Sequence, residues 1–289
     1  MVSQLRTRRG GSALDRKTIA LLTDFGSSGP YVGAMKAVIL GINADAILLD
    51  ITHQVGPQAV EEGAFLLSTV IPYLPEGSIC VAVVDPGVGT ERAAVALRTA
   101  HHIFVGPDNG LLSAALSDEQ RQPSPQPGQL AELPCPPDIE AVHLHNPEYF
   151  RHPVSTTFHG RDIFAPVGAH LSRGIELARL GPAAATLLVY PPWRRRARKD
   201  GAIEGRVVYA NHFGNIITDI RSTDLSGRRI RLSVAGREFE GLQRSFQEGP
   251  EYVVYIGSGG YLELARRNGN AATALGVKAG EHVEVHPIV

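Results

Sequence analysis

The sequence has little of several features that would place it in a specialised class. Its 289 residues include only two cysteines, Cys80 and Cys135, which cannot form a disulfide framework, and no CxxC pair or Cys/His cluster has zinc spacing. No segment reaches the roughly 18 continuous apolar residues needed to span a bilayer. The formal net charge is −1, so no overall basic field is available to hold nucleic acid. These shortages predict a cytoplasmic globular protein without a metal, membrane or nucleic-acid partner.

Familiar phosphate-binding loops are also missing. Neither GxGxxG nor GxxxxGK[ST] occurs, and the kinase-like strings DFG and HGRD stand in the wrong order for a protein kinase. The first 16 residues are basic, but no apolar stretch follows them. We therefore expect residues 1–16 to be a disordered extension rather than a signal peptide.

Alternating strands and helices are predicted for the first two thirds of the chain. Strands of buried character alternate with helical patterns, and such alternation favours a mostly parallel sheet with helices on both faces. The expected strands are Lys17–Leu22, Ala46–Ile51, Ser78–Val84, Ala93–Leu97 and His102–Val105, and the expected helices are Tyr31–Ile42, Val60–Tyr73 and Asp162–Leu171. This α/β fold is expected to occupy residues 17–190 as a catalytic domain.

Two irregular segments interrupt the pattern. Residues 117–140 are rich in Pro and Gln and are expected to form a long surface loop, which is either a lid or simply mobile. Residues 191–201 combine prolines, the basic run RRRARK and a glycine, as is typical of a linker; the basic run is either solvated linker or an anion-binding patch.

Short strands and turns are predicted for residues 202–289. The regular spacing of glycines between apolar segments favours a smaller β-barrel-like domain. The candidate strands are Ala202–Tyr209, Ile216–Ile220, Arg229–Val234, Tyr252–Ile256 and His282–His286.

Four polar residues follow strands or precede a helix, where ligands bind in such sheets. Asp24 lies in a turn after the first strand and could accept hydrogen bonds from two ribose hydroxyls, or could equally cap a helix or form an Asx-turn. Asp85 and Arg92 stand seven residues apart across a Pro/Gly turn, either as catalytic partners or as a structural ion pair. His159 alone is ambiguous, because the chain has 11 histidines.

Eight motifs that occur in a fixed order favour the functional alternative for each of these residues. From about Ile19 to the C-terminus, the chain resembles the S-adenosylmethionine hydroxide adenosyltransferases, which are related to the bacterial fluorinase and chlorinase. The motifs are TDFG, YVGAMK, VEEGA, VVDPGVGT with Arg92, GPDNGLL, FHGRDIFAP, FGNIITDI and SGGYLELA.

The resemblance assigns roles to nine residues. It implies that Asp85, Arg92 and His159 order and activate the attacking water and that Asp24 binds the ribose. It places the remaining substrate contacts at Asn211, Asn215, Ser258, Glu263 and Arg266. It also implies a homotrimer, with each active site formed by the N-terminal domain of one subunit and the C-terminal domain of the next. Relatives often carry an acid after TDFG where this chain has Gly29, which leaves the partner of the methionine ammonium unassigned.

The expected reaction is hydrolysis of S-adenosylmethionine at the ribose 5′-carbon, giving adenosine and methionine. Similar halogenases carry tyrosine where Asp85 stands, and the fluoride-using branch has other residues at His159 and Gly160 and an insertion before PDNG. A carboxylate at Asp85 would repel a halide, yet it can accept a proton from water. No cofactor or metal is expected, because the sulfonium leaves as a neutral thioether. A halogenase and a non-catalytic nucleoside-binding module are the alternatives.

Overall fold

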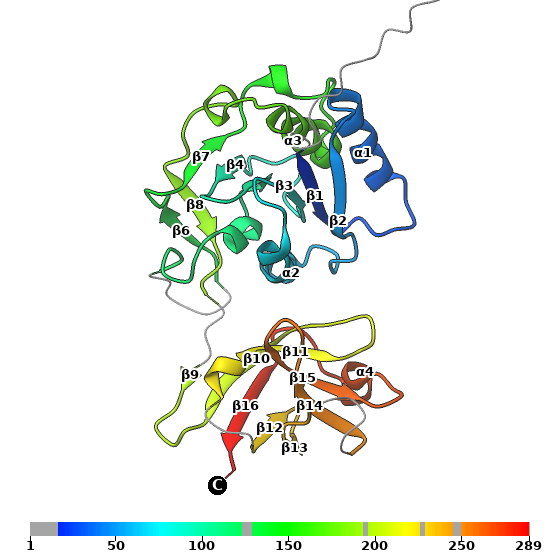
Figure 1. The fold of residues 1–289 in the computed structure, drawn as a ribbon, viewed down its shortest axis with the longest axis vertical. Helices are drawn as coiled ribbons and strands as arrows, with labels where there is room; N and C mark the ends of the chain where they lie inside the picture. The colour runs from blue at the N-terminus through cyan, green and yellow to red at the C-terminus, as the bar shows by residue number, and fades with distance from the viewer. Residues whose placement is uncertain (1–16, 123–128, 193–195, 226–228, 245–249, 289) are drawn as a thin grey trace, which may run out of the picture. The chain divides into compact units, whose positions relative to one another are not determined.

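The computed structural model describes residues 17–122, 129–192, 196–225, 229–244 and 250–288. The chain divides into two compact units, Met1–Tyr190 and Pro191–Val289, and each is described by itself (Figure 1). The expected extension, residues 1–16, lies outside the described residues, as do residues 193–195, which include the first two arginines of the basic run.

The N-terminal unit is built on a six-stranded sheet in the order β2-β1-β3-β5-β4-β7. Its strands are β1 (Thr18–Thr23), β2 (Ile47–Thr52), β3 (Ile79–Val83), β4 (Ala94–Arg98), β5 (Ile103–Pro107) and β7 (Glu140–His143). The first four in this order are mutually parallel, whereas β4 is antiparallel to both β5 and β7. The antiparallel part follows from the short connection between β4 and β5, because a parallel pair needs a long crossover.

Helices cover both faces of this sheet, as predicted. Along β1, Ile19 and Leu21 belong to one apolar cluster, and Ala20 and Leu22 belong to a second cluster. This alternation is the period of two that a strand imposes on its side chains. The first cluster contains residues of α1 (Tyr31–Ile42) and α3 (Ala165–Ser172), and the second contains residues of α2 (Val60–Val70).

The description of the second strand as buried was wrong. β2 lies at the edge of the sheet and pairs only with β1, so Ile47 remains 47% exposed and Leu49 remains 39% exposed. The run ILLDIT resembles a buried strand because its apolar content is high, but composition does not reveal which strand lies at the edge.

Two predicted helices need correction. The helix expected over Val60–Tyr73 ends at Val70 and continues as a 3₁₀ turn, Ile71–Tyr73, which contains Pro72. The helix expected from Asp162 begins instead as a π-helical turn, Gly160–Phe164.

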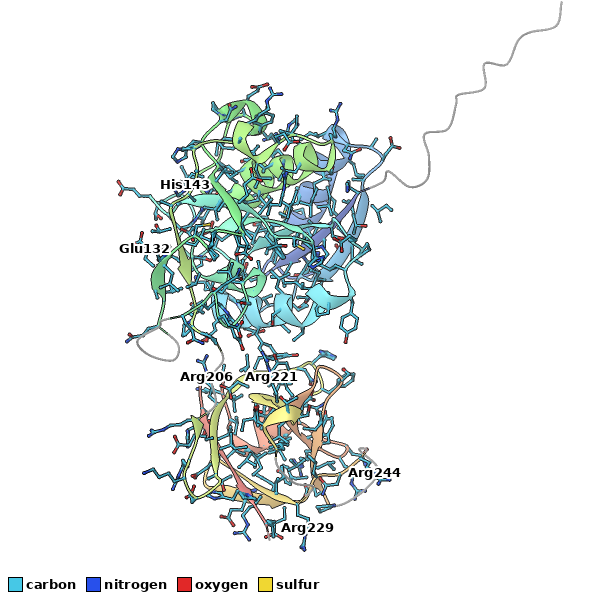
Figure 2. All side chains as sticks on the ribbon, turned by 60° about the vertical axis from the view of Figure 1, so that its left-hand side comes forward. Glu132, His143, Arg206, Arg221, Arg229 and Arg244 are labelled. Atoms are coloured by element: carbon cyan, nitrogen blue, oxygen red, sulfur yellow. The ribbon has the colours of Figure 1, made fainter. Side chains whose placement is uncertain are left out.

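The segment 117–140 is not entirely irregular. It contributes β6 (Ala131–Pro134), which pairs with β8 (Thr186–Val189) in a separate two-stranded sheet. Glu132 on β6 points outward (Figure 2) and accepts a hydrogen bond from Thr186 Oγ1 at 2.6 Å. Residues 123–128 of the segment lie outside the described residues.

The C-terminal unit is an antiparallel, barrel-like sheet in the order β13-β12-β16-β10-β11-β15-β14, with β9 added to β10. Its strands are β9 (Arg196–Ala197), β10 (Ile203–Ala210), β11 (Ile216–Arg221), β12 (Ile230–Val234), β13 (Arg237–Glu240), β14 (Tyr252–Ile256), β15 (Tyr261–Arg266) and β16 (His282–Pro287). One helix, α4 (Ala271–Leu275), follows β15. The predicted β-barrel-like character is confirmed. Part of the basic run belongs to this sheet, because Arg196 and Ala197 pair with β10.

Within the described residues, none of the helices has the length and apolar character needed to cross a membrane.

Candidate active site

The site is organised by the carboxyl edge of the parallel strands. In the β1–β3 pairing Thr23 lies opposite Val83, so the TDFG and DPGVGT loops leave the sheet at the same edge. Asp24 and Asp85 therefore follow neighbouring strand ends, which is where open α/β sheets bind ligands.

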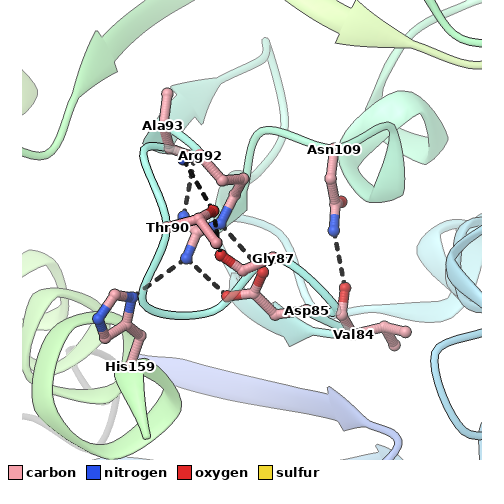
Figure 3. A network of polar contacts seen from close by, with 8 residues as sticks. All are labelled: Val84, Asp85, Gly87, Thr90, Arg92, Ala93, Asn109 and His159. Atoms are coloured by element: carbon pink, nitrogen blue, oxygen red, sulfur yellow. Dashed lines mark hydrogen bonds and ion pairs between the residues drawn. The ribbon is translucent and has the colours of Figure 1, made fainter. Parts of the chain in front are cut away.

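Asp85 and Arg92 form a bidentate ion pair (Figure 3). Arg92 Nε donates to Asp85 Oδ1 at 3.0 Å, and Nη2 donates to Oδ2 at 2.6 Å. The Asp85 side chain is only 4% exposed and that of Arg92 is 9% exposed, so the pair is held away from bulk water. Arg92 Nη1 also donates to the Ala93 carbonyl at 2.8 Å. The guanidinium is thus fixed in one orientation.

His159 joins this pair from the start of the π-helical turn. Its Nδ1 lies 3.2 Å from Arg92 Nη2 (Figure 3). A guanidinium can only donate, so Nδ1 is the acceptor and the neutral ring carries its proton on Nε2. Burial, together with the Arg92 charge, lowers the pKa of His159 below its ordinary value of 6.5. Hydrogen bonding and electrostatics therefore both favour a neutral imidazole.

Gly89 allows the DPGVGT loop to pack against the segment that leads to His159. Its φ is +76°, and a Cβ at this position would lie 2.2 Å from the Thr156 carbonyl oxygen. Any side chain at residue 89 must therefore push apart two backbone segments that both carry site residues.

The Gly89→Ala variant should lose both stability and activity. A left-handed alanine costs about 1–2 kcal/mol by itself, and the backbone collision should bring the loss in unfolding free energy to about 3 kcal/mol or more. Gly236→Ala is the matched control, because Gly236 has φ +69° with nothing within 4 Å of the added Cβ. Denaturant titration of both variants checks this, and equal losses would contradict the close approach at Gly89.

An aromatic cluster joins the TDFG loop to the turn at His159. Phe25 and Phe158 meet edge to face with ring centroids 5.6 Å apart, and Tyr31 and Phe158 do so at 5.3 Å. A Cβ on Gly160 would lie 3.1 Å from the Phe25 ring and 3.3 Å from Met35 Sδ. A larger residue at position 160 would therefore displace Phe25, the neighbour of Asp24.

Asp24 is held by a distant backbone amide rather than by its own turn. Its Oδ2 accepts from Gln58 N–H at 2.9 Å, and no hydrogen bond to Oδ1 is found among the described residues. The side chain therefore forms no Asx-turn, and the residue that caps α1 is Pro30. Both structural alternatives for Asp24 are excluded, and its carboxylate keeps acceptor capacity for a ligand.

Two neighbouring residues of GPDNGLL make hydrogen bonds that sequence reasoning did not anticipate, and the first of them, Asn109, supports the Asp85 loop. Asn109 Nδ2 donates to the Val84 carbonyl at 2.8 Å, directly before Asp85 (Figure 3). Asp108 Oδ1 accepts from Leu188 N–H at 2.9 Å, and burial raises the pKa of Asp108 to about 6. The position of this motif after β5, at the edge where Asp85 lies, was the signal that could have identified them.

Asp162 is a second buried carboxylate that sequence reasoning missed. It is 0% exposed, and it accepts from Arg161 at 2.6 and 2.7 Å, from Arg151 at 3.2 Å and from Ser155 N–H at 2.9 Å. Burial alone would raise its pKa, but the hydrogen bonds from Arg161 and Ser155 lower it below 3.8. Asp162 thus fixes both ends of the segment that carries His159.

The remaining predicted contacts lie in the C-terminal unit and do not share one role. Asn211 is occupied by its own turn, because its Oδ1 accepts from Phe213 N–H at 3.0 Å and from Asn215 N–H at 3.1 Å. Asn215 Nδ2 donates to Tyr255 OH at 3.2 Å, and Tyr255 OH donates to Glu263.

Some of these side chains meet at a hollow on this unit. Among the described residues, its lining comprises Phe213, Asn215, Glu251 and the turn 266–269. Arg266 Nε forms a 2.7 Å ion pair with Glu251 there. Asn211, Ser258 and Glu263 are not among the described lining residues, whereas Phe213, 75% exposed, was missed as a candidate despite its place in the FGN motif.

The described residues include no group of three or more His, Cys, Asp or Glu arranged to hold a metal ion. Asp85, Arg92 and His159 bring together a desolvated carboxylate, a fixed guanidinium and a neutral imidazole. Such a set can hold water, accept its proton and stabilise hydroxide.

Comparison with known proteins identifies the same family across both units. The N-terminal-domain profile of the SAM hydroxide adenosyltransferases matches residues 19–181, and the C-terminal-domain profile matches residues 205–284. An (R)-S-adenosyl-L-methionine hydrolase of Thermus thermophilus is 38% identical over 93% of this chain and 99% of its own. A fluorinase of Nocardia brasiliensis is 29% identical over 93% of this chain and 97% of its own. The crystal structure of an uncharacterized conserved protein from Thermotoga maritima matches with a TM-score of 0.79 at 32% identity, covering 93% of this chain and 100% of that one.

Proposed function

Because the chain belongs to the S-adenosylmethionine hydroxide adenosyltransferase family, we propose that it hydrolyses S-adenosyl-L-methionine at the ribose 5′-carbon, giving adenosine and L-methionine. The observation that carries the proposal is the desolvated contact of Asp85, Arg92 and His159 at the carboxyl edge of the sheet. The relatives named as hydrolases at up to 38% identity support the same activity.

The proposed reaction is a single in-line displacement. Water attacks the 5′-carbon, the carbon–sulfur bond breaks, and its electron pair remains on the sulfur of methionine. Since the leaving group is a neutral thioether, no acid, cofactor or metal is required on that side. Addition of EDTA should accordingly leave the rate unchanged.

The three side chains have different roles in activating the water. Both oxygens of Asp85 accept from Arg92, yet each keeps a further lone pair. His159 Nδ1 is occupied by Arg92, and its Nε2 carries the proton, so the ring can donate to the water but not accept from it. Asp85 is therefore the proton acceptor and releases the proton to solvent afterwards, while Arg92 stabilises the developing hydroxide. Positioned proton transfer of this kind contributes about 10²–10⁴-fold to rate.

Alignment of the 5′-carbon with the attacking water is the other contribution to the rate. Asp24 would clamp the ribose hydroxyls and so hold the 5′-carbon in front of the water. Such alignment is worth up to about 7–11 kcal/mol of barrier in favourable cases. The ribose contact is therefore expected to affect kcat as well as affinity.

Product analysis tests the proposal against a halogenase and a binding module. The protein is incubated with each sulfonium epimer of S-adenosylmethionine, with and without chloride or fluoride, and nucleosides are separated by chromatography and mass spectrometry. We expect adenosine and methionine in equal amounts, formed faster from the (R) epimer that names the relatives. A 5′-halo nucleoside would indicate a halogenase, and intact substrate would indicate a binding module.

The pH profile should report the neutral state of His159. Protonation would place an N–H against the Arg92 guanidinium, so activity should fall in acid. Because the pKa of His159 lies below 6.5, the midpoint of this fall should also lie below 6.5. Rates measured from about pH 4.5 to about pH 8 check this. A midpoint at or above 6.5, retained in His159→Ala, would contradict the assignment.

We further propose a homotrimer in the cytoplasm, in which the N-terminal unit of one subunit and the C-terminal unit of the next form each active site. Exposed apolar side chains on β2 and α1 support association: Ile47 is 47% exposed, Leu49 39% and Leu40 42%. Light scattering coupled to gel filtration should give three times the chain mass of 31.0 kDa. A monomer mass would contradict the proposal.

A further inference from the structure

A second chain of polar contacts lies beside Asp24, and it includes none of Asp85, Arg92 and His159. Thr23 Oγ1 lies 2.9 Å from His53 Nδ1, and His53 Nε2 lies 3.1 Å from Asp50 Oδ1. The latter is an ion-pair distance, although the contact lacks the geometry of a good hydrogen bond. The chain thus runs from the edge strand β2 to the last residue of β1.

The two ends of this chain indicate where its protons lie. The Asp50 carboxylate favours a proton on His53 Nε2, which leaves Nδ1 as an acceptor for the Thr23 hydroxyl. Thr23 Oγ1 in turn accepts from Phe25 N–H at 3.2 Å. The hydroxyl is therefore used as both donor and acceptor, and it closes the turn that contains Asp24.

The same loop is held by two backbone contacts from the segment 53–58. Gly26 N–H donates to the His53 carbonyl at 2.8 Å, and Gln58 N–H donates to Asp24 Oδ2 at 2.9 Å. Gln58 adopts φ 62°, a left-handed conformation that directs its amide in this way at some cost in strain. Asp24 and Gly26 are thus positioned by one neighbouring segment, while Phe25 is held by Thr23.

Thr23 cannot serve by touching a ligand. It is 0% exposed, and the His53 side chain is 11% exposed. Any effect of Thr23 on substrate must therefore pass through the conformation of residues 24–26.

We propose that Thr23 and His53 are positioning residues that hold the Asp24 carboxylate in the geometry needed to bind the two ribose hydroxyls. The inference rests on the proposed function, in which Asp24 clamps the ribose. The hydroxyl of Thr23 is the central element, since it joins the imidazole on one side to the Phe25 amide on the other.

The test compares Thr23→Val, which keeps the shape and removes the hydroxyl, with Thr23→Ser, which keeps the hydroxyl. Calorimetry measures binding of adenosine and of 2′,3′-dideoxyadenosine to the full chain. We expect Thr23→Val to bind adenosine at least about fivefold more weakly, to bind dideoxyadenosine as the wild type does, and to be restored by serine. Added to Asp24→Ala, Thr23→Val should have no further effect on adenosine.

Thr218→Val is the matched control for a lost buried hydroxyl. Thr218 is also 0% exposed and donates to the Leu262 carbonyl at 2.8 Å, far along the chain from Asp24. It should lose stability without the selective loss of adenosine. If Thr23→Val does not fold, His53→Ala takes its place, because it removes the same acceptor and retains the backbone contact to Gly26.

The inference would be overturned if Thr23→Val weakened the binding of both nucleosides equally, or weakened the binding of neither. It would also be overturned if the wild-type protein bound adenosine and 2′,3′-dideoxyadenosine equally well. Failure of the proposed function would give a different result: the wild-type protein would bind adenosine selectively but would not hydrolyse S-adenosylmethionine.

Discussion

Replacing Asp85 with asparagine should lower kcat by about 10²- to 10⁴-fold while changing the dissociation constant for adenosine by less than about threefold. The amide has nearly the shape of the carboxylate, but it cannot accept a proton, and its NH₂ group would face the donors of Arg92. Single-turnover kinetics and calorimetry measure the two quantities. His159→Ala should likewise lower kcat and leave the dissociation constant for adenosine nearly unchanged.

Asp108→Asn is the control for Asp85→Asn. Asp108 is a half-buried carboxyl near Arg92, and among the described residues its side chain accepts from Leu188 N–H, a bond that an asparagine oxygen can equally accept. Its kcat should stay within about threefold of the wild type. If Asp85→Asn lost adenosine affinity as severely as kcat, the Asp85–Arg92 pair would be a structural ion pair and not catalytic.

Asp162→Ala should lower the free energy of unfolding by about 1–3 kcal/mol, because it removes the buried carboxylate that accepts from the part-buried Ser155 amide and orders Arg151 and Arg161. Denaturant unfolding measures the loss. Asp200 provides a surface control, since it pairs with Arg198 at 2.9 Å on an exposed side chain, and Asp200→Asn should cause no measurable change. A similarly small change for Asp162→Ala would show that the 151–162 segment is held by other contacts.

The contribution of Asp162 should also depend on pH. Its pKa is lowered below 3.8 in the folded protein, so the stabilisation is complete above 3.8 and is lost as the pH falls through the folded value. The difference in stability between wild type and Asp162→Ala should therefore shrink in strong acid. A difference that does not change with pH would argue against an ionised Asp162.

Local patterns predicted the elements that are determined locally. The helix Tyr31–Ile42 was predicted with its observed bounds, because a Gly/Pro-rich turn precedes an uninterrupted apolar pattern. β1 and β3 were predicted within one residue at each end. By contrast, β15 was interpreted only as a binding motif, although its run YLELAR forms a central strand between β11 and β14.

Long-range contacts explain what the sequence could not provide. The eight ordered motifs were enough to propose that Asp85, Arg92 and His159 act together. The partners that hold Asp24 and Thr23, Gln58 and His53, lie about thirty residues further along the chain and became identifiable only once β1 and β2 were placed side by side. Asn211 was predicted as a ligand contact from the resemblance, and only the structure shows that its side-chain oxygen accepts hydrogen bonds from its own turn.

Isotope labelling tests the role of water most directly. The protein is incubated with S-adenosylmethionine in ¹⁸O-enriched water, and the adenosine formed is analysed by mass spectrometry with fragmentation of the ribose. We predict one ¹⁸O atom in the 5′-hydroxyl and none in methionine. Adenosine whose 5′-oxygen comes from any source other than the solvent would contradict direct attack by water held at Asp85, Arg92 and His159.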